Sequence, residues 1–107
     1  MIELVRYQHE DGREPYTEWF RGLRDQMAKI RIAARLRQIE YGNLGDAKPV
    51  GEGVMELRID VGAGYRVYCG RRGLSWVILL CGGDKSGQTK DIARAKALWN
   101  EWKRRQL

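Results

Sequence analysis

The second half of the chain holds three strand-like runs, and a short glycine-containing turn separates each run from the next. Residues 54–61 alternate between apolar and charged side chains, and residues 65–71 follow the turn at 62–64. A second turn at 72–73 leads to residues 75–81, which are apolar on both sides. Turns this short allow only antiparallel neighbours, because a parallel pair needs a crossover of roughly a dozen residues. The sequence therefore predicts an antiparallel meander whose last strand is central.

The remaining segments add one strand and three helices. Residues 2–8 alternate like a strand, residues 15–23 and 25–41 have helical periodicity, residues 42–53 form a polar loop, and residues 89–105 form the last helix. The order β-α-α-β-β-β-α predicts an α+β fold. It consists of a small, mostly antiparallel sheet, an N-terminal helical hairpin and a C-terminal helix, with the helices packed on one face. A chain of 107 residues has room for one domain, so we expect the whole chain to form it.

Two apolar stripes run along opposite sides of the helix predicted over residues 25–41. One consists of Leu23, Met27, Ile30, Ala34 and Tyr41, and the other of Ala28, Ile32, Leu36 and Ile39. A helix that is apolar on two sides is normally packed between two neighbours, so we expect the first helix and the sheet to cover it. The last helix carries a single stripe that we assign to the core: Ile92, Ala95, Trp99 and Trp102.

The charge is unevenly distributed along the chain. The 20 Lys and Arg exceed the 14 Asp and Glu, which gives a net charge of +6. Residues 1–20 hold two basic and five acidic groups, so residues 21–107 hold the other eighteen basic and nine acidic groups, a net charge of +9. A basic body of this kind favours a polyanionic partner such as nucleic acid, because neutralising phosphates releases counterions. The alternative is that the charge serves solubility.

Several classes of protein are disfavoured by simple counts. The longest apolar run, residues 76–81, is far shorter than the ~20 residues of a membrane helix. The first residues alternate charged and apolar side chains and lack the apolar region of a signal peptide. Cys69 and Cys81 form no CxxC motif, and the one histidine, His9, is distant in sequence. We therefore expect a cytoplasmic protein without membrane, metal or cofactor, with two buried thiols and a surface histidine.

One face of the predicted meander gathers cationic side chains. A tight turn at 62–64 is expected to set Asp60 opposite Arg66, and Arg58 opposite Tyr68. Both arginines and the tyrosine then share the sheet face opposite the apolar one.

Lys85 follows the turn after the third strand and is expected at the rim of the same face. Cations hold phosphates and an aromatic ring stacks on a base, so these four side chains predict a site for single-stranded nucleic acid. The alternative is a solvated outer face, with Asp60–Arg66 and Glu56–Arg58 as ordinary ion pairs.

Four motifs in this order resemble the RelE/ParE toxin superfamily, specifically its HigB-like "addiction module killer" branch. They are MELRID at 55–60, GYRVY at 64–68, LLCGGDKS at 79–86 and KDIARAK at 90–96. The similarity covers essentially the whole chain. It implies a single toxin domain over residues 1–107, from a bacterial type II toxin–antitoxin module, with a helix-turn-helix (HigA-like) antitoxin as partner. RelE-like and HigB-like members are ribosome-dependent endoribonucleases that cleave mRNA without metal, whereas ParE-like members poison DNA gyrase.

The resemblance assigns catalysis and RNA binding to Arg58, Arg66 and Lys85, which match the basic positions of the RNase members. Two arginines suit stabilisation of the phosphorane, because a planar fork contacts two oxygens. Lys85 suits charge stabilisation or protonation of the leaving oxygen. The candidate proton acceptors on this face are Glu56, Asp60 and, more weakly, Tyr68.

The last helix departs from the pattern of the RNase members. Several of those relatives have a tyrosine or histidine in or near this helix, and residues 90–93 contain neither. Two alternatives therefore stay open: a ParE-like gyrase poison, and a non-catalytic module that binds nucleic acid and antitoxin.

Overall fold

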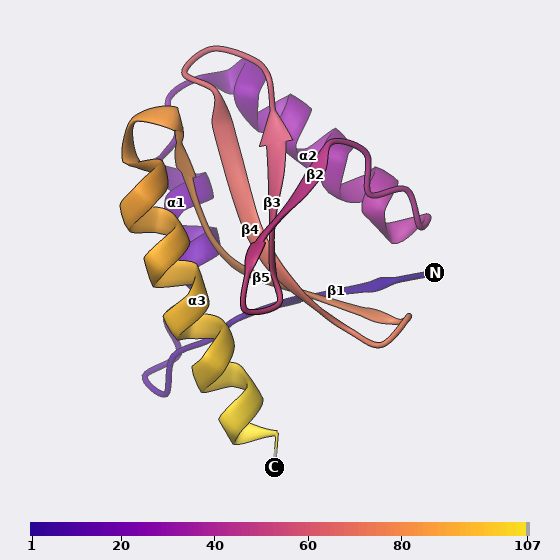
Figure 1. The fold of residues 1–107 in the computed structure, drawn as a ribbon. Coiled ribbons are helices and arrows are strands. Elements are labelled where there is room, and N and C mark those ends of the chain that lie inside the picture. Colours follow the sequence, from indigo (N-terminus) through magenta and orange to yellow (C-terminus); the bar gives the residue numbers. More distant parts are fainter. Residues whose placement is uncertain (107) are drawn as a thin grey trace.

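The computed structural model describes residues 1–106, which form five strands, three α-helices and one short 3₁₀ helix (Figure 1). In chain order these are β1 (Glu3–Arg6), α1 (Pro15–Gly22), α2 (Gln26–Glu40), β2 (Ala47–Gly51), β3 (Val54–Ile59), β4 (Tyr65–Arg72), β5 (Trp76–Asp84), η1 (Lys85–Gly87) and α3 (Gln88–Arg105). The α+β class and the three predicted helices are confirmed.

The strands form one sheet in the order β1-β5-β4-β3-β2. The neighbours from β2 to β5 are antiparallel, and β1 pairs with β5 in parallel. The predicted meander is therefore correct, and β5 is an inner strand. The helices, however, lie on both faces of the sheet: α1 and α2 pack on one, and α3 packs on the other (Figure 1). The prediction that all helices share one face is wrong.

The segment predicted as a polar loop over 42–53 contains strand β2. This strand pairs Lys48 with Glu56 and Pro49 with Met55 at the outer edge of the sheet. Proline is tolerated at an edge, because its missing N–H removes no bond to an inner neighbour. The composition of β2, with its lysine, proline and glycine, hides a strand whose pairing with β3 comes from the tertiary structure.

Strand β5 continues through the two glycines at which the sequence predicted its end. Gly82 pairs with Val67, and Gly83 pairs with Arg66. A Cβ atom on Gly82 would lie 2.2 Å from the ring of Trp19. Gly82 is thus glycine because α1 approaches the strand closely, not because the strand turns there.

Two hydrophobic clusters fill the space on either side of the sheet. The cluster under α1 and α2 includes Ile32, Leu57 and Leu79, and the cluster under α3 includes Leu80 and Trp99. The stacked rings of Trp99 and Trp102, with centroids 5.3 Å apart, confirm the predicted core stripe of α3.

Helix α2 is covered on one side only. Its stripe of Ala28, Ile32, Leu36 and Ile39 is buried against the sheet. In the opposite stripe, Leu23 lies before the helix and packs against the core, but Met27 is 55%, Ile30 62% and Tyr41 68% exposed. The prediction of a helix packed between two neighbours is wrong, because α1 lies on the sheet itself instead of over α2.

The described residues add three findings on the predicted class. None of the helices within residues 1–106 is long and apolar enough to cross a membrane. Over the same residues, no group of three or more His, Cys, Asp or Glu side chains is placed to hold a metal ion. Cys69 and Cys81 are buried free thiols, and burial raises the pKa of each to about 12.

Candidate functional site

The register of the β3–β4 hairpin differs from the predicted one by two residues. Arg58 lies directly opposite Arg66, and Glu56 lies directly opposite Tyr68. The loop is longer than the predicted turn at 62–64, because the strands end at Ile59 and Tyr65 and Val61 folds into the connection. A shift of two residues keeps every side chain on its face. The predicted grouping of Arg58, Arg66 and Tyr68 on one face is therefore correct, although the partners are not.

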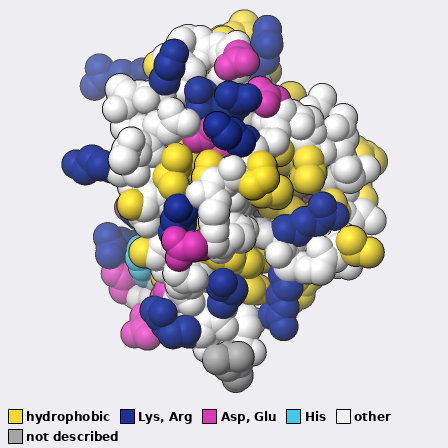
Figure 2. All heavy atoms as spheres, viewed as in Figure 1, with side chains coloured by type: hydrophobic (Ala, Val, Ile, Leu, Met, Phe, Trp, Pro, Cys, Tyr) yellow, Lys and Arg dark blue, Asp and Glu magenta, His cyan; other side chains and the backbone are white. Residues whose placement is uncertain are grey.

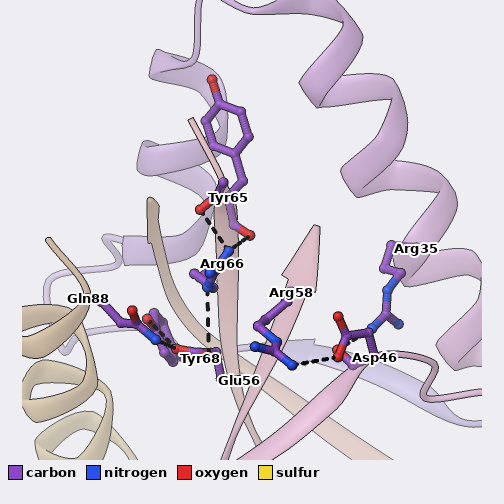
Figure 3. A network of polar contacts seen from close by, with 9 residues as sticks. Arg35, Asp46, Glu56, Arg58, Tyr65, Arg66, Tyr68 and Gln88 are labelled. Carbon is purple, nitrogen blue, oxygen red and sulfur yellow. Dashed lines mark hydrogen bonds and ion pairs between the residues drawn. The ribbon is translucent and has the colours of Figure 1, made fainter. Parts of the chain in front are cut away.

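Glu56 lies at the buried centre of this face. It is 1% exposed, and its Oε2 accepts hydrogen bonds from Tyr68 Oη at 3.0 Å and from Gln88 Nε2 at 2.8 Å (Figure 3). Its Oε1 is buried, lies 3.8 Å from Arg66 Nε and accepts no hydrogen bond. A buried carboxylate with an ion-pair partner and two donors is held in one position.

Arg66 is held on one side and free on the other. It is 7% exposed, and its Nη1 donates to the carbonyl oxygens of Gly64 at 2.9 Å and Tyr65 at 3.2 Å. Its Nε faces Glu56. Within residues 1–106, Nη2 makes no hydrogen bond and, unlike Nε, is not buried. The guanidinium therefore presents one donor group to solvent from a fixed position.

Arg58 is anchored in the same way from the opposite edge of the site. Its Nη2 lies 3.2 Å from Asp46 Oδ1, and the side chain is 39% exposed. Asp46 is itself fixed, because its carbonyl oxygen accepts a hydrogen bond from Arg35 Nη2 at 2.6 Å (Figure 3). Arg58 and Arg66 thus form a direct cross-strand pair of like charges, and each has a carboxylate partner, Asp46 for Arg58 and Glu56 for Arg66.

Lys85 lies at the rim of this pair, as the sequence predicts. It is exposed in η1, directly after β5, and its backbone N–H donates to the carbonyl oxygen of Ala63 at 3.4 Å. A Cβ atom on Gly64 would lie 3.4 Å from Lys85 Cβ and 3.5 Å from Arg66 Nη1. Gly64, at a φ of 75°, therefore separates the lysine stem from the arginine. Figure 2 shows Lys and Arg side chains gathered near the β3–β4 loop.

Two sequence-based expectations about this face are wrong. Tyr68 is fully buried, so its ring is not accessible for stacking on a base, and burial together with the bond to Glu56 raises its pKa well above the usual range. The solvated outer face is also wrong, because α3 covers part of the sheet and Glu56 pairs with buried Arg66 instead of Arg58. Asp60 lies outside β3, is exposed and does not face Arg66.

Two residues at the start of α3 complete the site and were not predicted. Gln88 binds Glu56, and the carboxylate of Asp91 lies over Gly83, the cross-strand partner of Arg66. Burial raises the pKa of Asp91 above its ordinary value, with nearby Asp84 adding to the effect. The sequence shows that Gln88 and Asp91 come before the apolar stripe of α3. It does not show that the start of this helix lies against the sheet.

The geometry supports anion binding at the open side of the site. Arg58 and Arg66 are cross-strand partners, and Lys85 lies beside Gly64 near Arg66. Within residues 1–106, each arginine keeps one Nη group without a hydrogen bond. His9 lies elsewhere: its ring is 5.1 Å from that of Tyr7, beside Arg105 at the C-terminal end of α3. The site therefore offers fixed positive charge, with the buried carboxylate of Glu56 behind it.

Comparisons with known proteins give one relationship. No family model matches the chain, and no solved structure matches it. A protein of Haemophilus influenzae described as uncharacterized is 50% identical over 86 residues, which cover 80% of this chain and 87% of that protein. The chain belongs to the same family as this H. influenzae protein.

Proposed function

We propose that the chain is the toxin of a bacterial type II toxin–antitoxin module and inhibits translation by cutting mRNA on the ribosome. The proposal combines the arrangement of Arg58, Arg66 and Lys85 with the resemblance of the four sequence motifs to the HigB-like branch. It includes a RelE/ParE-like topology, with β2 as an edge strand, and the cytoplasm as the place of action. The proposed partner is a helix-turn-helix, HigA-like antitoxin.

The observation that carries the proposal is the direct cross-strand pair of Arg58 and Arg66. Like charges directly opposite each other destabilise a sheet. An anion bound between the free nitrogens of the two guanidinium groups would remove this repulsion and replace it with two attractions. A phosphodiester is such an anion, and a guanidinium contacts phosphate oxygens in a planar, directional way.

These cations suit the cleavage of RNA through its own 2′-hydroxyl. The 2′-oxygen attacks the neighbouring phosphorus and gives its proton to solvent water, while the bond to the 5′-oxygen breaks and that oxygen gains a proton. The products are a 2′,3′-cyclic phosphate and a 5′-hydroxyl. In the proposed mechanism, Arg58 and Arg66 stabilise the charge of the phosphorane, and Lys85 protonates the leaving oxygen.

The contacts of Glu56 make it a positioning residue for Arg66. One carboxylate oxygen is occupied by Tyr68 and Gln88, and the other faces Arg66 from a buried position. The chain therefore contributes charge stabilisation more than proton transfer. Such a site needs a substrate that is already held with the attacking and leaving oxygens in line. The ribosome would supply that geometry, which makes ribosome dependence part of the proposal.

The test is primer extension on a reporter mRNA in a bacterial translation extract, with and without the purified chain. We expect cuts in register with codons, on translated message only. Arg58→Ala, Arg66→Ala and Lys85→Ala are expected to abolish the cuts while the protein stays folded by circular dichroism. Arg71→Ala is the matched control, because Arg71 is an exposed arginine of β4 that contacts the carbonyl of Gly73 outside the site.

Three results would contradict the proposal. Intact message at a chain concentration that stops translation would refute the nuclease, and gyrase-mediated DNA cleavage would then identify the ParE-like alternative. Full cleavage by all three alanine variants would refute the site. Failure of a co-expressed neighbouring helix-turn-helix protein to restore growth would refute the proposed partner.

A further inference from the structure

The outer side of α2 carries an apolar stripe that no part of residues 1–106 covers. Met27, Ile30 and Tyr41 are each more than half exposed, and Ala34 lies between them. Their spacing of three, four and seven residues places them on one side of the helix, opposite the buried stripe. The stripe is about 21 Å long at the rise of an α-helix. Large side chains in such a row are costly to leave in water and typically mark an interaction surface.

The same helix and the residues just before it are basic. Residues 21–41 contain six basic side chains and two carboxylates, Asp25 and Glu40, which gives a net charge of +4. The basic residues are Arg21 and Arg24 before α2, and Lys29, Arg31, Arg35 and Arg37 within it. Within residues 1–106, no ion pair reaches any of these six. Arg35 donates only to the carbonyl oxygens of Leu44 and Asp46, which leaves its charge uncompensated. The apolar stripe is therefore flanked by cationic side chains that form no ion pair within residues 1–106.

The positive charge beside the stripe indicates which kind of partner can bind to it. A second copy of the chain would set one strongly basic helix against another, and the repulsion would oppose the contact. RNA would satisfy the charge but would leave Met27 and Ile30 without an apolar partner, since aliphatic side chains give neither stacking nor hydrogen bonds. A helix with its own apolar stripe and acidic flanks satisfies both features at once.

We propose that the outer stripe of α2, formed by Met27, Ile30, Ala34 and Tyr41, is a docking site for an acidic amphipathic helix of a partner protein. The partner helix lies along α2, with its apolar side chains on the stripe and its carboxylates beside the flanking arginines. The inference does not depend on RNA cleavage, because the stripe faces away from the sheet that carries Arg66.

The test uses three designed helical peptides with the same leucine stripe and with flanking residues that are all Glu, all Gln or all Lys. Fluorescence anisotropy measures the affinity of the full chain for each, at low and at physiological ionic strength. We expect the Glu peptide to bind most tightly and to weaken as salt screens the charges. Ile30→Glu and the double variant Met27→Ala/Ile30→Ala should each weaken it about tenfold or more.

Two matched variants separate this surface from others. Leu74→Glu changes a side chain that is 83% exposed on the β4–β5 turn, and it should leave peptide binding unchanged. Arg66→Ala should also leave peptide binding unchanged, so that failure of the nuclease and failure of the docking site are distinguishable. If either control variant changes the Kd of the Glu peptide as much as Ile30→Glu does, the outer stripe of α2 is not the docking site.

The remaining outcomes identify other occupants. No binding of the Glu peptide, or equal binding of the Lys peptide, overturns the proposal. So does a dimer in sedimentation that Ile30→Glu converts to a monomer, because the stripe is then a contact between two copies. The chain is also tested with a single-stranded RNA oligonucleotide and with phosphatidylglycerol vesicles. If it binds one of them and Ile30→Glu abolishes that binding, the stripe binds RNA or lipid and the proposal is overturned.

Discussion

Arg58 and Arg66 lie directly opposite each other on β3 and β4, although two like charges in that position repel. Their surroundings hold them there, because Asp46 contacts Arg58 and Glu56 faces Arg66. The repulsion is thus maintained by fixed partners instead of being relieved by rotation of the side chains. At the level of single residues, this is the arrangement expected of a site prepared to receive an anion.

Inorganic phosphate is expected to raise the unfolding temperature of the wild-type chain. A ligand that binds the folded state and not the unfolded state stabilises the fold by mass action. Arg58→Ala and Arg66→Ala should each remove most of the shift, and Arg71→Ala should keep it. Differential scanning fluorimetry with sodium chloride at matched ionic strength separates binding from screening. An equal shift in all four proteins would show that the phosphate acts elsewhere.

Asp91 is a single residue that is expected to make the stability of the fold depend on pH. Burial raises its pKa above the ordinary value of 3.8, so the folded state binds the proton more tightly than the unfolded chain. The stabilising contribution of the protonated carboxyl is complete below the unfolded pKa and is lost as the pH rises through the folded pKa. Asp91→Asn should therefore gain stability relative to the wild type as the pH rises from about 4 to about 7. Urea unfolding across this range measures the difference, and a constant difference would contradict it.

At the scale of elements, the sequence predicts the helices and strands that have a clear local periodicity. It does not predict features that depend on contacts between segments distant in the sequence. The three helices and the strands of the meander follow from alternation and helical spacing. Strand β2 was missed because an edge strand tolerates Pro49 and is defined by its pairing with β3. The end of β5 was misplaced because glycine marks both a turn and a close contact, and only the position of Trp19 tells the two apart.

The candidate site follows the same division. Its cationic members were found because Arg58, Arg66 and Lys85 lie on strands or turns with clear patterns. The prediction that Arg58 and Arg66 share one face is correct although the predicted register is wrong by two residues. Side chains alternate between the two faces of a strand, so a shift of two residues leaves each on the same face. The burial of Glu56 and Tyr68 depends on α3, which covers that end of the sheet. The length of the loop before α3 does not show where the helix packs, so this burial was not predicted.

Gly82 and Gly83 provide a matched test of helix–strand approach. A Cβ on Gly82 meets the ring of Trp19, which α1 holds against the sheet, whereas a Cβ on Gly83 meets the flexible carboxylate of Asp91. Gly82→Ala should therefore lower the free energy of unfolding by about 2 kcal/mol, as overpacking does, and Gly83→Ala by less. Urea unfolding of both variants measures the two losses. A larger loss for Gly83→Ala would show that Asp91, not Trp19, is the more rigid neighbour.

At the scale of the whole molecule, one sheet separates two hydrophobic clusters, and each cluster contains one cysteine. Cys69 lies in the cluster under α1 and α2, and Cys81 lies in the cluster under α3. Burial raises the pKa of both thiols to about 12, so neither is present as the reactive thiolate near neutral pH while the chain is folded. Each thiol therefore becomes reactive only when its own layer opens.

The alkylation rates of the two thiols should be equal and should rise together with urea. A small domain whose layers share one sheet is expected to unfold cooperatively, since neither cluster is enclosed without the central strands. Mass spectrometry of peptides from each cysteine, after pulses of iodoacetamide at increasing urea, measures the two rates separately. Earlier labelling of Cys81 than of Cys69 would show that α3 leaves the sheet as an independent unit. Such an opening would also release Gln88 from Glu56, and with it the support of Arg66.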